Sequence, residues 1–188
     1  MLLDAYSMVD KGIVESLRIE TSRGRKLACS RGCSSCCKTH QTIPVYPLEL
    51  VGLSWYVIEK MIRPERAVLK NQLRDYRENG PCPFLTDGTC SVHAMRPIAC
   101  RQFNVFNKPC DEGEDPYYTR RGDVLTPIKK YVDHAFFIML PFYGIAGERE
   151  RWKIIESGAV HGIVKLMQTC NWESLAAKME EFERQKVQ

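Results

Sequence analysis

The sequence predicts a mainly α protein in which a helical hairpin and C-terminal helices surround an irregular cysteine-rich loop region. Apolar residues recur at helical spacing on both sides of residues 80–112, whereas that segment is rich in Pro, Gly and Cys and has no regular periodicity. Eight of the nine cysteines fall between Cys29 and Cys110. We expect the 188 residues to form a single domain, 1–188, with a cysteine-cluster core at 27–112 and C-terminal helices at 128–187.

The segment before the loop region contains three expected helices. A short helix is predicted over 6–17, followed by a polar loop over 21–26. Pro47 followed by Glu49 opens a second helix, which carries apolar residues at helical spacing up to position 62. A third begins at Pro64 and is stopped by residues 79–81, Asn-Gly-Pro. The second and third helices form the predicted hairpin, which folds the chain back between two groups of cysteines.

The segment after the loop region is also expected to be helical. Residues 111–127 form a polar connector, and helices are predicted over 128–140 and 148–170. A final helix follows Asn171, a favourable N-cap residue, and aligns Trp172, Leu175 and Met179 on one face.

Composition and charge narrow the class of protein. With 44% hydrophobic and 27% charged residues, the chain is typical of a soluble globular protein. The acidic N-terminal segment does not resemble a secretion signal, so we expect a cytoplasmic protein, where clustered cysteines bind metal or perform redox chemistry more often than they form disulfides. The net charge of +4 is modest, so nucleic-acid binding is not expected, and no apolar run is long enough to predict a membrane span.

The spacing of the cysteines indicates a metal site. Cys29, Cys33, Cys36 and Cys37 form a dense first group, in which gaps of two or three residues allow thiolates to converge on one ion. A second group follows the hairpin, and together the two groups offer eight candidate metal ligands: Cys29, Cys33, Cys36, Cys37, Cys82, Cys90, Cys100 and Cys110. A bound metal would staple a region with too little apolar periodicity to order itself. Cys170 lies apart and is expected in the core.

These motifs resemble the YkgJ-type cysteine-cluster family, whose CxxCxxCC domain is linked to zinc or iron chelation. The resemblance covers roughly residues 27–104. The family's cysteine positions fall on Cys29, Cys33, Cys36, Cys37, Cys82, Cys90 and Cys100, and its other signature residues on Arg96, Pro97, Arg101 and Phe103. This chain has three residues between Cys29 and Cys33 where many members have two. The resemblance implies metal binding. Flagellin lysine-N-methylase is similar in its cysteine motifs, which suggests a link to protein methylation.

The chemistry of the ligands leaves the metal open. A structural zinc site needs four Cys or His ligands, and an iron–sulfur cluster needs three or four thiolates with nearby hydrogen-bond donors. Arg96 and Arg101 flank Cys100 and are candidate cofactor-binding residues, because they could offset the charge of bound thiolates. His40 and His93 each follow a cysteine by three residues, but we expect packing or hydrogen bonding from both.

Several functions remain open at this stage. The preferred prediction is a cytosolic accessory or carrier metalloprotein holding zinc or an iron–sulfur centre, with most ligands from Cys33, Cys36, Cys82, Cys90 and Cys100. The alternative is a cluster-dependent redox or protein-methylation-linked enzyme. A thiol–disulfide enzyme lacks its usual βαβ context, and the CxxxCxxC spacing of radical enzymes appears here without a barrel pattern. A metal ion is the expected partner, and a protein partner is left open.

Overall fold

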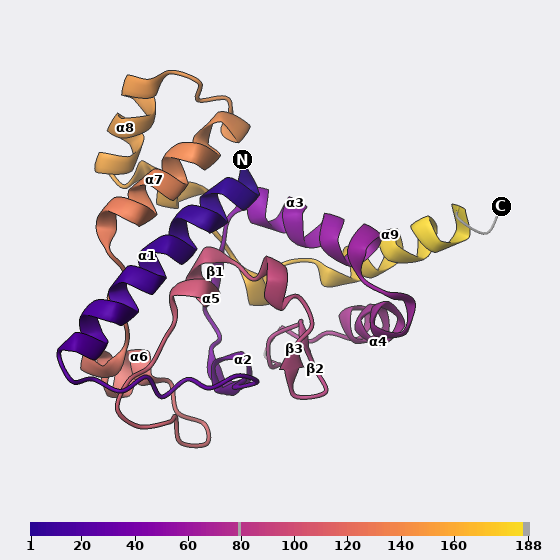
Figure 1. The fold of residues 1–188 in the computed structure, drawn as a ribbon. Helices are drawn as coiled ribbons and strands as arrows, with labels where there is room; N and C mark the ends of the chain where they lie inside the picture. Colours follow the sequence, from indigo (N-terminus) through magenta and orange to yellow (C-terminus); the bar gives the residue numbers. More distant parts are fainter. Residues whose placement is uncertain (79, 186–188) are drawn as a thin grey trace.

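The structure is a computed structural model that describes residues 1–78 and 80–185, and its fold is mainly α, as predicted (Figure 1). Short 3-10 turns link several of the helices. In chain order the helices are α1 (Leu2–Ser22), α2 (Ser35–Thr39), α3 (Pro47–Trp55) with a π-helical continuation (Tyr56–Lys60), α4 (Arg63–Arg74), α5 (Ile98–Gln102), α6 (Pro116–Thr119), α7 (Lys129–Met139), α8 (Glu148–Glu156) and α9 (Trp172–Gln185). None of the helices in this part of the chain is long and apolar enough to cross a membrane.

The cysteine region contributes to two short antiparallel strand pairs, one of which joins it to the C-terminal part of the chain. Strand β1 (Pro44–Val45) pairs with β4 (Lys165–Leu166), 120 or more positions later in the sequence. Strands β2 (Leu85–Thr86) and β3 (Thr89–Cys90) form a hairpin around Asp87 and Gly88, which both have a positive φ. The β1–β4 pairing brings a C-terminal segment against the chain that follows the first cysteine group.

Helix α1 packs along α7, and the two lie side by side in Figure 1. Gly12 makes this close approach possible, because a Cβ at this position would lie 2.6 Å from Cβ of Tyr131. The Tyr131 hydroxyl also donates a hydrogen bond to Glu15. The helix predicted over 6–17 is therefore confirmed and extends further at both ends.

Both helices of the predicted hairpin, α3 and α4, are found, but α4 packs mainly against α9. Lys70 of α4 pairs with Glu183 of α9. Asn171 caps α9 as predicted, since its Oδ1 accepts a hydrogen bond from the Ser174 amide at 2.9 Å. The stop predicted at 79–81 and the end of the predicted C-terminal helices at 186–187 involve residues outside the described part, although α4 itself ends at Arg74.

The helix predicted over 148–170 is wrong beyond α8. The helix gives way at Gly158, which adopts a left-handed conformation with φ of +74°. The chain continues as a 3-10 turn (Ala159–Ile163), strand β4 and a second 3-10 turn (Met167–Thr169). Pairing with β1 thus overrides a helical pattern of apolar residues, and it places Met167 beside the cysteine region.

Candidate metal centre

All eight predicted cysteines line one cavity of about 910 Å³, which we call the cysteine cavity. They come from segments up to 81 positions apart in the sequence, on loops, on α2, on the β2–β3 hairpin and on α5. All nine cysteines of the chain are free thiols. Cys170 does not line the cavity and packs at the edge of the core, where its thiol donates to the Leu166 carbonyl at 3.3 Å.

The first cysteine group is shaped by turns and by one short helix. Gly32, with φ of +83°, provides the left-handed residue before Cys33. Cys36 and Cys37 lie on α2. Cys29 precedes these turns on an extended segment, and its sulfur accepts a hydrogen bond from the Val105 amide at 3.3 Å. That contact joins the first group to the segment that follows α5.

Backbone contacts bring the second cysteine group against the first. The Cys82 amide donates to the Cys37 carbonyl at 2.7 Å, which fixes these two residues next to each other. Cys90 lies opposite Leu85 in the β2–β3 hairpin, and Cys100 lies on α5. The predicted return of the chain is therefore confirmed in its geometry.

The thiols fall into two sets according to their electrostatic neighbours. Within the inner set, Cys37 interacts with Cys36 and Cys82. Cys100 interacts electrostatically with Cys36, Cys37 and Cys90. Within the outer set, Cys110 interacts with Cys29 and Cys33, and Cys33 is exposed. Cys29 also interacts with Cys36, so the two sets are in electrostatic contact. We call Cys36, Cys37, Cys82, Cys90 and Cys100 the inner thiols, and Cys29, Cys33 and Cys110 the outer thiols.

Burial and contacts with neighbouring thiols raise the pKa of four inner thiols, Cys36, Cys37, Cys90 and Cys100. The hydrogen bond to Cys37 and then burial raise the pKa of Cys36, and burial raises the pKa of Cys100 well above its ordinary value. The contact with Cys36 lowers the pKa of Cys37, but the contact with Cys82 and burial outweigh it and raise that pKa to about 12. Several thiolates can therefore form together only if a cation compensates them.

The donor set fits zinc or iron, although the side chains are not yet closed around an ion. Thiols are the common ligands of structural zinc and of iron–sulfur clusters. Across residues 1–78 and 80–185, no three or more His, Cys, Asp or Glu side chains already form a metal-ligand group. An ion bound by three or more of these thiols would therefore need their sulfur atoms to move closer together.

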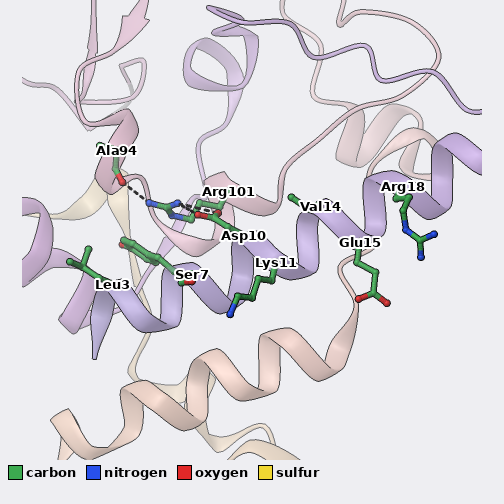
Figure 2. A pocket seen from close by; sticks show the side chains of 10 residues that line it. Leu3, Ser7, Asp10, Lys11, Val14, Glu15, Arg18, Ala94 and Arg101 are labelled. Atoms are coloured by element: carbon green, nitrogen blue, oxygen red, sulfur yellow. Dashed lines mark hydrogen bonds and ion pairs between the residues drawn. The ribbon is translucent and has the colours of Figure 1, made fainter.

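The two candidate arginines lie in different environments. Arg96 lines the cysteine cavity, where its charge offsets part of the rise that burial causes in the pKa of Cys29 and Cys90. Arg101 does not line the cavity, and its guanidinium turns toward α1 (Figure 2). It donates to Asp10 at 2.8 Å and to the Ala94 carbonyl at 2.6 Å, as Figure 2 shows. Arg101 thus holds α5 and the preceding turn against α1.

Sequence reasoning missed the role of Glu49, which is completely buried. One carboxylate oxygen accepts from the Ile98 amide at 2.7 Å and the other from the Tyr46 amide at 2.9 Å. Burial raises the pKa of Glu49. Because Ile98 begins α5, Glu49 fixes the helix that carries Cys100. The only sequence signal is the position of Glu49 in the first turn of a helix that begins with Pro47.

The two histidines near the cysteines also line the cavity. His40 packs edge-on against Phe103 at 4.3 Å, in keeping with the packing expected for it. Its Nε2 atom lies 3.1 Å from Asp115, without the alignment of a hydrogen bond. Burial lowers the pKa of His40. His93 is exposed at the edge of the cavity.

Fold and site together define a mainly α protein with a cavity lined by thiols. Comparison with known families agrees: the sequence model of the CxxCxxCC family, described as a putative zinc- or iron-chelating domain, matches residues 28–121. The chain belongs to this family. The match covers the whole cysteine cavity except the C-terminal segment that contributes Met167. Neither the curated proteins nor the solved structures include a match to this chain.

Proposed function

We propose that this protein binds zinc or iron through the thiolates of the cysteine cavity and acts as a cytoplasmic accessory or carrier metalloprotein. One observation carries the proposal: eight thiols from distant parts of the sequence line a single cavity. Buried cysteines that serve only as small apolar residues do not need to gather in this way. The family description points to the same two metals.

The inner thiols supply most of the ligands in this proposal, and among the outer thiols Cys33 is exposed. Cys33, Cys36, Cys82, Cys90 and Cys100 remain the preferred ligands, with Cys29 and Cys37 completing the set. Four thiolates around one divalent ion leave a net charge of −2. Arg96 supports such a site, because it lines the cavity and forms no ion pair within residues 1–78 and 80–185.

The eight thiols are twice the number needed for one tetrahedral ion. The same donor set can therefore hold two zinc ions or one iron–sulfur cluster with thiols to spare. Either centre requires reduced cysteines, which favours a reducing compartment such as the cytoplasm.

The test is metal analysis of protein purified without oxygen, together with a visible absorption spectrum. Iron with acid-labile sulfide and a visible band identifies a cluster, whereas colourless protein with one or two zinc ions identifies a zinc site. Cys36→Ser and Cys90→Ser should each lose metal and order in the loop region, because ligand loss removes folding free energy. Cys170→Ser is the matched control and should retain both. Unchanged metal content in the first two variants would overturn the proposal.

The size of the cavity supports a second candidate function, a cluster-dependent redox or protein-methylation-linked enzyme. A volume of about 910 Å³ is in the range of small-molecule sites and far exceeds that of a metal ion. Exposed Tyr117 and Tyr118 lie at its edge and could contact a second ligand. Reversible reduction of an anaerobically purified cluster would favour this function, and a redox-inactive zinc protein would exclude it.

A further inference from the structure

We infer that the thioether of Met167 is a further metal ligand, and that with Cys37 and Cys82 it forms a soft-metal site for Cu(I) at the buried end of the cysteine cavity. The inference rests on the proposed function in one respect, since it needs the inner thiols to bind metal. It adds a ligand from outside the family's matched region, residues 28–121, and a different metal ion.

The Met167 sulfur lies close to a cysteine sulfur of the cavity. It lies 3.8 Å from Sγ of Cys82, and Met167 lines the same cavity as the eight cysteines. Two sulfurs that bind one ion at about 2.3 Å each lie ~3.8 Å apart when the angle between them is tetrahedral. The two side chains therefore already have the separation that a shared ion requires.

Hydrogen bonds and burial hold Met167 and Cys82 in place. The Met167 amide donates to the Ile43 carbonyl at 2.8 Å, and its carbonyl accepts from the Trp172 indole at 2.8 Å. Across the cavity, the Cys82 amide is bonded to the Cys37 carbonyl. Met167 is completely buried and Cys82 is 6% exposed, so little ordering entropy remains to be lost when an ion binds.

A thioether ligand favours a soft metal ion. Zinc sites are built from Cys, His and carboxylate ligands, whereas thioether sulfur selects soft ions such as Cu(I). Cys37 and Cys82 would each release a proton as the ion binds, and the resulting charge of −1 is smaller than that of a four-thiolate zinc site.

Met167→Leu is the informative variant, because leucine has a similar volume and no sulfur. Met179→Leu is the matched control, since Met179 is equally buried but lies on α9 away from the cavity. The full chain, reduced and metal-free, is titrated with Cu(I) in competition with a chromogenic chelator, and separately with Zn(II). Met167→Leu should weaken Cu(I) binding by about tenfold or more, because loss of a residue that only hydrogen-bonds to a metal ligand already has an effect of this size. Zn(II) binding should be nearly unchanged. Met179→Leu should alter neither.

Copper-edge X-ray absorption of the selenomethionine-labelled protein provides a direct readout of ligation. The inference predicts a selenium neighbour of copper that disappears in Met167→Leu. Three outcomes would overturn the inference and leave the proposed function standing. They are copper bound without a selenium neighbour, equal Cu(I) affinity in Met167→Leu and wild type, and a wild type that binds zinc or iron but not Cu(I). A wild type that binds none of these metals would overturn the proposed function itself.

Discussion

Glu49→Gln is the substitution whose effect follows most directly from the structure. The carboxylate is completely buried and accepts two backbone hydrogen bonds, from Ile98 and from Tyr46. Glutamine keeps one acceptor oxygen but turns an NH2 group toward the second amide, so one buried N–H loses its partner. Such a loss costs about 1–3 kcal/mol. For a chain of this size, it corresponds to a decrease of about 2–12 °C in the melting temperature.

The assay is thermal and urea unfolding of the metal-free protein, with Glu59→Gln as the control. Glu59 is exposed at the end of the same helical segment, so its substitution should change the free energy of unfolding by less than about 0.5 kcal/mol. Because Glu49 positions α5, Glu49→Gln should also retain less metal at Cys100. A change below about 0.5 kcal/mol in Glu49→Gln would refute the assignment of Glu49 as the residue that fixes α5.

Three further predictions test other parts of the structure. Gly12→Ala should destabilise the protein by about 1–3 kcal/mol in urea unfolding, because its Cβ would collide with Tyr131; wild-type stability would contradict the α1–α7 packing. The pKa of Glu114 is lowered to about 2, mainly by hydrogen bonds from Arg120. The Glu114–Arg120 pair should therefore order residues 111–123 fully above the ordinary pKa of 4.5, and this order should be lost as the pH falls through about 2. Equal protection from hydrogen exchange at pH 5 and pH 2 would contradict this prediction. Arg101→Lys should speed release of bound metal to a chelator, since lysine cannot reach both the α1 carboxylate and the backbone carbonyls; an unchanged release rate would show that α5 is held by other contacts.

The helices were largely predictable because their signals are local. Helical spacing, the Pro47 start and the Asn171 cap depend on residues within one or two turns, and each is found where the sequence placed it. The failure at 148–170 has a non-local cause. Pairing of residues 165–166 with 44–45 depends on a partner far away in the sequence, and no local pattern encodes it. The left-handed Gly158, which follows the end of α8, was not identified as a break in the sequence.

The candidate site was also only partly predictable from the sequence. The crowding of cysteines predicted that the two groups converge, and the position of Cys170 predicted its separation from them. The partners that hold the site could not be predicted, because Glu49 and Met167 look like ordinary helix residues in the sequence. Arg101 matched the family signature and flanked a cysteine, yet its side chain turns toward α1, since the direction of a side chain on a short helix depends on tertiary packing.

The central claim, that the thiols of the cysteine cavity are the metal ligands, is tested most directly by mapping thiol protection. The metal-loaded full chain is alkylated without denaturation and without oxygen, and each cysteine is quantified by peptide mass spectrometry before and after removal of the metal by a chelator. We expect bound metal to protect the inner thiols and chelation to expose them, while Cys170 reacts at the same rate in both states. Equal labelling of Cys36, Cys82, Cys90 and Cys100 with and without bound metal would contradict it.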